Sequence, residues 1–359
     1  MRPAGPLRVG VVASARFPIR EPFAGGLEAH TWSLVRGLQQ RGHEVSVFAA
    51  PGSDPALGAR ELPVRTAVLS DTARADVSSS PEWWMQEHHA YLSMMLELAD
   101  SALDVVHNNS LHYLPVAMAA SLRAPVVTTL HTPPTAWLES AVQAPATCPV
   151  TFAAVSEHTA RAWRHVVPDA AVIRNGVDTA RWRQGPGGGP AVWSGRLVPE
   201  KGPHLAARAA RLAGVPLRLA GPVLDQAWYD AEVAPHLGGD IEHVGHLRTD
   251  ELVQLVGEAS ASLVTPCWEE PYGLVVAESL SCGTPVAGFA RGALPELVDR
   301  RHARLVAPND VVALSAALLE AVELDRGAAR AHAVSTCSVE VMVESYERLY
   351  VDPGVRRAA

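Results

Sequence analysis

The sequence predicts an α/β protein made of two Rossmann-like domains. Short apolar runs rich in β-branched residues alternate with stretches of helical periodicity through almost the whole chain. At 359 residues the chain is also too long for one ordinary hydrophobic core. The stretch RQGPGGGP at residues 183–190 suggests where the chain divides, because four glycines and two prolines in eight residues favour a flexible connection.

The first half of the chain begins with an expected buried strand, LRVGVVAS, at residues 7–14. A helix is expected over residues 26–42, where Leu34 and Leu38 lie on one face and Gly42 ends the pattern. Further strands are expected at EVSVFAA, DVVHNNS, PVVTTLH and TFAAVS, and the last three end in polar residues. Ligands of parallel sheets bind at the carboxyl ends of strands, so we expect a site there.

The segment SSSPEWWMQEHHAYLSMMLELADSAL, at residues 78–103, predicts a long helix capped by its serines. Its large apolar side chains recur at helical spacing, which favours a place in the core. The alternative is an aromatic wall for a bound acceptor. The residues concerned are Trp83, Trp84, Tyr91, Met94 and Met95.

In the second half the alternation restarts with AVWSGRL, PLRLAG, IEHVGHL, SASLVTP, PVAGF and ARLVAP, with helical segments between most of them. The last apolar segment, VEVMVESYERLY, also predicts a helix. We therefore expect one domain over residues 1–178 and a second over residues 179–337. The C-terminal helix, residues 338–359, is expected to pack back on the first domain.

Composition argues against several classes of function. The net charge is −8 and the basic residues are scattered, so neither nucleic acid nor an anionic membrane surface is an expected partner. Four cysteines without C-x-x-C spacing fit a reducing compartment. The N-terminus lacks the pattern of a secretory signal, and no apolar stretch approaches the roughly 20 residues of a membrane span. We expect a cytoplasmic protein, and the histidines show no metal-binding pattern.

The stretch WSGRLVPEKG places two cations at the carboxyl end of an expected strand. Gly195 ends the strand, Arg196 follows it, and Lys201 opens the next helix. Arginine can bind a diphosphate through a bidentate fork, and lysine can bind it as a point charge. The alternative is a pair of solvated charges.

The stretch CWEEPYGLVVAESLSCG places two carboxylates around a turn. Glu270 lies in the loop after a strand, and Glu278 lies inside the following helix, whose first amides near Gly273 and Leu274 are free to bind oxygens. The two acids could accept hydrogen bonds from two sets of hydroxyls. Acids that merely favour the helix dipole would explain Glu270 and its neighbour but not Glu278.

Two features of the first half could also bind a ligand. Gly25 and Gly26 precede a long helix, where backbone amides can approach an anion, although a plain turn is equally open. His131 ends a strand in TLHTPP and could donate to an anion or polarise a hydroxyl, although a lone histidine is usually structural.

Taken in order, these motifs resemble the family-4 retaining glycosyltransferases. The resemblance runs from Gly25 to Val298. It implies a GT-B fold, in which two Rossmann-like domains face each other across a cleft, and transfer of a sugar from a nucleotide-sugar donor. The matching segments are AGGLEAH, TLHTPP, AAVSEHTA, VIRNGVDTARW, SGRLVPEKG, EEPYGLVVAESLSCGTPV and ARGALPELV.

By this resemblance, Arg196 and Lys201 would bind the donor diphosphate, and no metal or other cofactor would be needed. Glu278 would bind the ribose, while the family spacing selects Glu270 over Glu269 for the sugar hydroxyls. The implied catalytic residues are His131, Arg196, Lys201 and Glu270. The implied donor-binding residues are Gly25, Gly26, Gly195, Arg196, Lys201, Glu270, Tyr272, Gly273, Leu274, Val275 and Glu278.

The resemblance leaves the substrates open. Pro271 and Tyr272 stand where the family more often has Gly-Phe, so the sugar contacts can differ there. We expect a UDP-hexose donor, with GDP-mannose as the second candidate, and a small molecule or glycan as acceptor. The residues also leave open a nucleotide-sugar epimerase or sugar phosphorylase of the same fold, and a two-domain sugar-binding protein.

Overall fold

The computed structural model describes residues 5–62, 64, 66–144 and 150–351. Contacts divide the chain into two compact units. The first unit holds Met1–Val155, Thr159–Ile173 and Val343–Ala359, and the second holds Ser156–His158 and Arg174–Met342. The domain limits expected from the sequence stay a prediction.

The first unit is built on a parallel sheet of seven strands, in the order β3-β2-β1-β4-β5-β6-β7. Every strand-like run predicted in this half contains one of them. The strands are β1 (Arg8–Val12), β2 (Glu44–Ala49), β3 (Arg60–Glu61), β4 (Val105–Asn108), β5 (Val126–Leu130), β6 (Thr151–Ala154) and β7 (Ala171–Val172).

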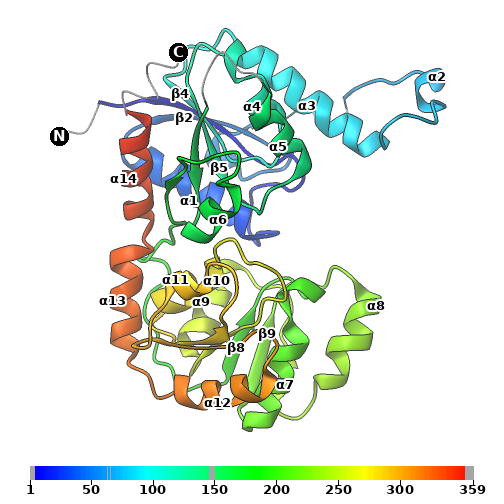
Figure 1. Cartoon of the computed structure of the whole chain (residues 1–359). Coiled ribbons are helices and arrows are strands. Elements are labelled where there is room, and N and C mark those ends of the chain that lie inside the picture. The colour runs from blue at the N-terminus through cyan, green and yellow to red at the C-terminus, as the bar shows by residue number, and fades with distance from the viewer. Residues whose placement is uncertain (1–4, 63, 65, 145–149, 352–359) are drawn as a thin grey trace. The chain divides into compact units, whose positions relative to one another are not determined.

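Helices cover both faces of this sheet, which explains why its central strands are apolar throughout rather than alternating. Val9, Val11 and Val12 of β1 have no exposed surface. Figure 1 shows the long helix α3 on the opposite side of the sheet from α1 and α14. The helices are α1 (Gly26–Gln40), α2 (Asp71–Arg74), α3 (Glu82–Leu98), α4 (Leu114–Ala117), α5 (Ala136–Gln143), α6 (Glu157–Trp163) and α14 (Val339–Tyr350), with shorter turns at Pro55–Leu57 and Ala119–Ser121.

Helix α3 differs in part from its sequence prediction. Its N-cap is Pro81, and no side chain makes a capping hydrogen bond, so the serines before it do not cap it. Tyr91, Met94 and Met95 are buried, as expected for core residues. Trp83 is 61% exposed, however, because the first turn of α3 extends past the sheet that buries the rest.

The last helix, α14, is fixed to the first sheet by two tyrosines. Within the first unit, the hydroxyl of Tyr350 lies 2.6 Å from Nδ1 of His107 on β4. The hydroxyl of Tyr346 lies 2.9 Å from Oγ1 of Thr129 on β5. The end of the chain therefore packs against strands that come some 200 residues earlier.

The second unit contains a parallel sheet of six strands, in the order β10-β9-β8-β11-β12-β13. Figure 1 shows α7 and α12 on one face of this sheet and α9, α10 and α11 on the other. Its strands are β8 (Ala191–Ser194), β9 (Leu217–Ala220), β10 (Ile241–His243), β11 (Ser262–Val264), β12 (Val286–Phe289) and β13 (Ala303–Val306). Its helices are α7 (Pro203–Ala213), α8 (Gln226–Trp228), α9 (Thr249–Glu258), α10 (Leu274–Ser281), α11 (Leu294–Leu297), α12 (Val311–Ala321) and α13 (Arg326–Thr336), with shorter turns at Pro199–Lys201, Tyr229–Val233 and Ala234–His236.

The glycine-rich stretch at residues 183–190 is not the flexible connection that its composition predicts. It lies inside the second unit, where the amides of Gly185, Gly187 and Gly189 donate to backbone oxygens of that unit. A Cβ atom at Gly185 would lie 2.3 Å from the carbonyl oxygen of Gly257. Gly185 and Gly189 are therefore needed because the backbone at Gly257 and Glu258 passes in contact with them.

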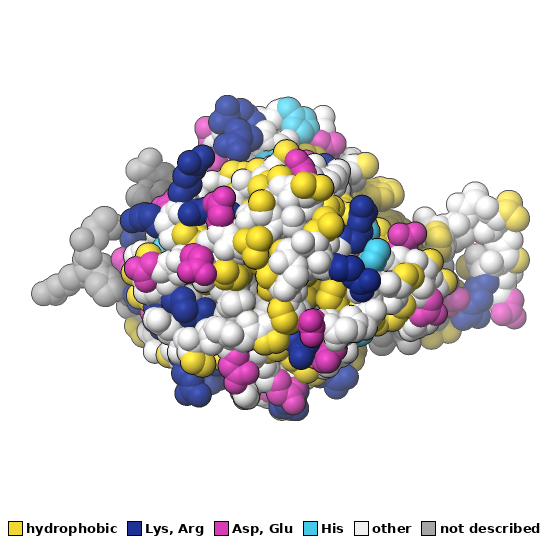
Figure 2. Space-filling view, turned by 90° about the horizontal axis from the view of Figure 1, so that it is seen from below, with side chains coloured by type: hydrophobic (Ala, Val, Ile, Leu, Met, Phe, Trp, Pro, Cys, Tyr) yellow, Lys and Arg dark blue, Asp and Glu magenta, His cyan; other side chains and the backbone are white. Residues whose placement is uncertain are grey.

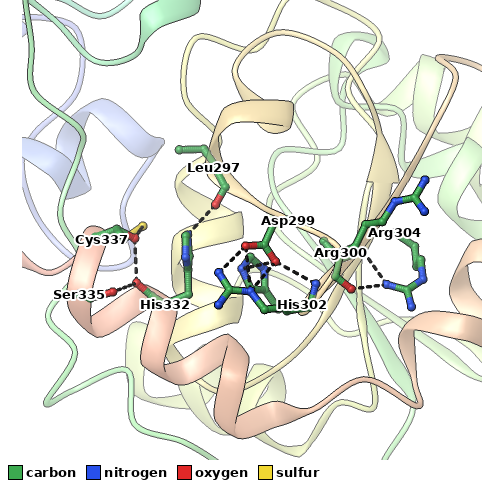
Figure 3. Close-up of polar contacts among 11 residues, drawn as sticks. Leu297, Asp299, Arg300, His302, Arg304, His332, Ser335 and Cys337 are labelled. Atoms are coloured by element: carbon green, nitrogen blue, oxygen red, sulfur yellow. Dashed lines mark hydrogen bonds and ion pairs between the residues drawn. The ribbon is translucent and has the colours of Figure 1, made fainter.

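A histidine pair fixes α11 against α13 (Figure 3). The rings of His302 and His332 lie 4.4 Å apart, and Nε2 of His332 lies 2.9 Å from the carbonyl oxygen of Leu297 at the end of α11. Asp299 beside them is bound by Arg301, which together with a backbone amide holds the pKa of that carboxyl far below its ordinary value. This arrangement supports the end of α11 and the loop that follows it.

The distribution of surface charge and the length of the helices are relevant to binding of nucleic acid or membrane. On the face shown in Figure 2, basic and acidic side chains are interspersed rather than gathered by sign. Among the described residues, no helix is both long enough and apolar enough to cross a membrane.

Candidate functional site

The second sheet reverses its strand order between β8 and β11, which is where open parallel sheets bind ligands. The loop after β8 carries Gly195, Arg196 and Lys201. The loop after β11 carries Glu270 and leads into α10. The structure therefore brings the two sequence motifs of the second half to one point.

Thr265, directly after β11, joins the two loops. Its hydroxyl lies 3.1 Å from the carbonyl oxygen of Lys201 and 2.8 Å from that of Gly202. The amide of Cys267 donates to the carbonyl oxygen of Glu200 at 2.8 Å. Gly202 has φ of +66°, and a Cβ atom there would lie 2.2 Å from the carbonyl oxygen of Thr265. Only glycine allows this approach, which places Lys201 beside the second loop.

Lys201 and Glu270 form an ion pair although they are 69 positions apart, with Nζ 2.5 Å from Oε2. Trp268 contacts both residues. Its indole N–H donates to the same Oε2 at 3.0 Å, and Nζ of Lys201 lies 5.1 Å from the centre of its ring. Nη2 of Arg196 lies 3.6 Å from Oε1 of Glu200, one turn further along the first loop.

The structure separates the two adjacent glutamates. Glu269 is 56% exposed and faces a different loop, with Oε1 3.6 Å from Nε of Arg291 and Oε2 accepting from the amide of Gly292 at 3.1 Å. Glu270 is 15% exposed and faces Lys201. Glu269 therefore helps to hold the loop, and Glu270 is the carboxylate available to the site.

Helix α10 begins at a glycine turn. Gly273 has φ of +93° and is the N-cap, and no side chain in the described part of the chain caps the helix, so Leu274 and Val275 lie in its uncapped first turn. The side chain of Tyr272 points away into the core, where its hydroxyl donates to the carbonyl oxygen of Asn175 at 2.7 Å. This tyrosine can therefore reach a ligand only through its backbone.

Glu278 lies on α10, one turn beyond that N-terminus. Burial raises the pKa of its carboxyl to about 8. Within the described part of the chain, its carboxyl oxygens have no hydrogen-bond or ion-pair partner. A half-buried carboxylate without a partner is unfavourable, so it is suited to accept hydrogen bonds from a ligand.

The first sheet reverses its order between β1 and β4. Gly25 is the N-cap of α1 and Gly26 its first residue, and none of the side chains that the structure describes caps this helix. His131 follows β5, and its Nε2 lies 2.8 Å from Oδ1 of Asn109, the residue after β4. Burial holds the pKa of His131 well below its ordinary value, so the ring is neutral at neutral pH.

His30 is a second histidine at this edge, and it lies on α1. Its ring meets that of His131 edge-on, with centroids 4.9 Å apart. Among the described residues, neither ring nitrogen of His30 makes a regular hydrogen bond, and burial lowers the pKa of His30 to about 4. Sequence reasoning missed both His30 and Asn109. The polar end of DVVHNNS was the only signal for Asn109.

An exposed aromatic surface lies at the same edge of the first sheet. The ring of Trp137 on α5 lies 5.4 Å from Tyr113 and 5.5 Å from Trp84, and Trp84 stacks on His88 at 5.2 Å. Trp137 is 58% exposed. We call these four residues the aromatic surface.

Sequence reasoning also missed Trp268 and one sign of the importance of Lys201. A single tryptophan beside two glutamates has no recognisable pattern. Lys201, however, is the only lysine in a chain that holds 30 lysines and arginines in total. Among the described residues, no group of three or more His, Cys, Asp or Glu side chains could hold a metal ion.

The chain matches two family descriptions that together cover most of it. Residues 24–181 match Glycosyltransferase Family 4, and residues 189–335 match Glycosyl transferases group 1. The first region contains the candidate site residues of the first unit, and the second region contains those of the second unit.

Relatives and solved structures agree with that match. The glycogen synthase of Mycobacterium tuberculosis is 29% identical over 341 residues, which cover 82% of this chain and 81% of that protein. The phosphatidyl-myo-inositol mannosyltransferase of Mycolicibacterium smegmatis is 27% identical over 348 residues, or 89% and 86% of the two chains.

Among solved structures, AviGT4, a glycosyltransferase involved in avilamycin A biosynthesis, is 25% identical with a TM-score of 0.70, covering 96% of this chain and 97% of that one. HepE of Anabaena, solved with UDP and glucose, shares the fold at 17% identity and a TM-score of 0.72, covering 96% and 99%. The chain therefore belongs to glycosyltransferase family 4 and is a retaining glycosyltransferase of the GT-B fold.

Proposed function

We propose that this enzyme transfers a hexosyl group from a UDP-sugar to a hydroxyl of a small molecule or glycan. The observation that carries the proposal is the contact between Lys201 and Glu270 at the switch point of the second sheet. It places a cation suited to a diphosphate beside a carboxylate suited to sugar hydroxyls. Family membership favours glycosyl transfer over epimerase, phosphorylase or simple sugar-binding activity.

The donor would lie along the loop and helix of the second unit. Arg196 and Lys201 would bind the diphosphate, together with the uncapped amides of Leu274 and Val275. Glu270 would accept hydrogen bonds from sugar hydroxyls, and Glu278 from the ribose diol. In the first unit, His131 would bind a sugar hydroxyl through its neutral ring, and Gly25 and Gly26 would allow the backbone to approach the diphosphate.

Transfer with retention needs no carboxylate nucleophile in this scheme. The acceptor oxygen forms its bond to the anomeric carbon on the face from which the diphosphate departs. The bond from that carbon to the phosphate oxygen breaks, and the acceptor proton passes to the departing oxygen. Arg196, Lys201 and the dipole of α10 would stabilise the charge that develops there. We propose that these cations supply the positive charge without a metal, so a chelator would leave the rate unchanged.

UDP is proposed because HepE, which shares the fold, was solved with UDP and glucose. A GDP-mannose donor is the second candidate, because a mannosyltransferase is among the relatives that match most of the chain. For the acceptor, the aromatic surface favours a molecule with a ring that can stack on Trp137. The cytoplasmic location expected from the sequence stays a prediction.

A thermal-shift series with UDP-glucose, GDP-mannose and ADP-glucose tests the donor. A ligand that binds only the folded state raises the melting temperature in proportion to the logarithm of its concentration. We expect the largest rise with the UDP-sugar. A rise confined to GDP-mannose would support the mannosyltransferase, and no rise with any of the three would overturn the proposed donor class.

A further inference from the structure

Two donors meet at one oxygen of Glu270. The ammonium of Lys201 lies 2.5 Å from Oε2, and the indole N–H of Trp268 donates to the same atom at 3.0 Å. Among the described residues, no partner contacts the other oxygen, Oε1. The carboxylate is therefore fixed through one oxygen and leaves the second for a ligand.

We propose that Trp268 is a positioning residue for both halves of the donor site. Its N–H holds Glu270 so that Oε1 is presented to the sugar, and its ring face keeps Lys201 within reach of the diphosphate. This inference rests on the proposed function, because it assigns the sugar end to Glu270 and the phosphate end to Lys201.

A second hydrogen-bond donor to Glu270 is useful because Lys201 has two partners, Glu270 and the diphosphate. While the site is empty, its ammonium pairs with Glu270. When a diphosphate binds, the same ammonium has to turn toward the phosphate oxygens, which carry more charge. Glu270 would then lose its strongest partner in a half-buried position, where an unpaired carboxylate is unfavourable. The indole N–H remains bonded to Oε2 and keeps the carboxylate in place during this exchange.

The indole ring also limits where Lys201 can go. A lysine side chain has four rotatable carbon–carbon bonds and loses much entropy when it is fixed. With its ammonium 5.1 Å from the centre of the Trp268 ring, Lys201 gains a cation–π contact near the ion pair. A small movement across this face would transfer the ammonium from carboxylate to phosphate without releasing it to solvent.

The residues on either side of Trp268 are held by hydrogen bonds, one through its backbone and the other through its side chain, so the indole itself is well placed to orient others. On one side, the amide of Cys267 donates to Glu200 at 2.8 Å. On the other, the carboxylate of Glu269 accepts from the amide of Gly292 at 3.1 Å. Simple packing does not account for the direction of the indole, because a half-buried tryptophan can leave its N–H in water.

The test compares W268F, which keeps an aromatic face but removes the N–H, with W268L, which removes both. The tryptophan control is W228F, since Trp228 is half-buried in the same unit and lies on α8, outside both loops of the site. We expect W268F to lower kcat/KM for the nucleotide sugar about 10-fold while the Kd for UDP stays within about twofold. W268L should in addition weaken UDP binding, because Lys201 loses its ring contact.

A double-mutant cycle identifies the partner. If Trp268 acts through Glu270, then adding W268F to E270A, which removes the acceptor of the indole N–H, should lower kcat/KM by less than about twofold further. An undiminished loss of about 10-fold on the E270A background would overturn the inference, and so would wild-type kinetics in W268F alone. Thermal unfolding of each variant identifies a loss of folding. If W268L fails to fold, the kinetics of W268F and the double-mutant cycle still test the role of Trp268.

Because the chain has a single lysine, the contact between Lys201 and Trp268 can be measured without any nucleotide sugar. Reductive methylation with ¹³C-formaldehyde labels only Lys201 and the N-terminal amine, and K201R identifies the lysine signal. We expect the ring current of Trp268 to shift this signal in the free enzyme, and W268L to abolish that shift; an unchanged signal in W268L would overturn the ring contact. Failure of the wild type to bind any nucleotide sugar would overturn the proposed function while this contact remained measurable.

Discussion

Nε2 of His131 lies 2.8 Å from the amide oxygen of Asn109, so the histidine donates its only ring proton to that oxygen. The neutral ring then carries its free lone pair on Nδ1. Burial keeps the pKa of His131 well below its ordinary value, which makes this tautomer persist across neutral pH. His131 is therefore prepared to accept a hydrogen bond from a substrate hydroxyl rather than to carry a charge.

Replacing Asn109 by aspartate should make the enzyme sensitive to pH. A carboxylate at that position favours the protonated ring, so the pKa of His131 rises and the ring loses its acceptor lone pair as the pH falls through the new value. We expect kcat of N109D to fall toward acidic pH where that of the wild type is flat. The check is a pH–rate profile beside an unfolding curve, and parallel profiles for the two proteins would contradict the assigned tautomer.

Arginine should not be able to replace Lys201, although every other residue among the 30 lysines and arginines of the chain is an arginine. Its ammonium is a compact point charge between Glu270 and the ring of Trp268, and a planar guanidinium is longer and needs a different approach. We expect kcat to fall about 10- to 1,000-fold in K201A and at least about 10-fold in K201R. Single-turnover rates measure this, and a K201R variant with wild-type rates would remove the steric part of the explanation.

Glu278 should make the free enzyme less stable as the pH rises. Its pKa is raised from the ordinary 4.5 to about 8, so between these values the folded chain keeps a proton that the unfolded chain has released. Stability from this group is complete below about pH 4.5 and is lost as the pH approaches 8. E278Q cannot ionise, so its melting temperature relative to wild type should be higher at pH 8.5 than at pH 5.

The same variant should bind nucleotide more weakly. Ribose hydroxyls donate to the ionised carboxylate, so wild-type binding should release a proton and strengthen as the pH rises toward 8. Calorimetry in two buffers of different ionisation enthalpy measures the proton, and Glu323→Gln, at an exposed glutamate of the same unit, is the control. Equal nucleotide affinities in wild type and E278Q would contradict the ribose assignment.

Trp137 should contribute to acceptor binding and not to the donor. Its exposed ring stacks on Tyr113 and contacts Trp84 at a tilt, which gives a fixed apolar face for an acceptor ring. We expect W137A to raise the acceptor KM about 3- to 10-fold and to leave hydrolysis of the donor in water unchanged. W83A is the matched control, because Trp83 is similarly exposed on α3 but lies outside the aromatic surface. Equal effects of the two changes would rule out a specific platform.

Gly202 and Gly214 flank α7 with nearly the same backbone conformation, φ of +66° and +64°. A Cβ atom at Gly214 would meet nothing within 4 Å, whereas at Gly202 it would lie 2.2 Å from the carbonyl oxygen of Thr265. We expect G214A to lower the free energy of unfolding by about 1 kcal/mol and G202A to lower it by roughly 1–3 kcal/mol more. Urea unfolding compares them, and G202A should also lower kcat because it displaces Lys201. Equal destabilisation would show that the close approach is relaxed in solution.

Local pattern predicted the fold class, several helices and the strands apart from the two-residue edge strands β3 and β7, because apolar periodicity and glycine stops act within a few residues. It also placed Arg196, Lys201 and Glu270 after the carboxyl ends of strands, where parallel sheets bind ligands, and Glu278 in the helix that follows. Composition misled where the glycines of residues 183–190 were read as a flexible connection. Gly185 and Gly189 are glycines because the backbone at Gly257 and Glu258 passes against them, a contact more than 60 positions away that no local pattern contains.

Tertiary structure alone decided how the site residues are oriented. The sequence places Glu269 and Glu270 side by side, and only the loop around Gly292 and the position of Lys201 send them in opposite directions. Trp268 and Asn109 acquire their partners in the same way, from segments that the sheet order brings together. The direction of a side chain depends on contacts between segments that are distant in the sequence. The sequence could therefore identify Lys201 and Glu270 as site residues, but it could not identify Trp268, which contacts both.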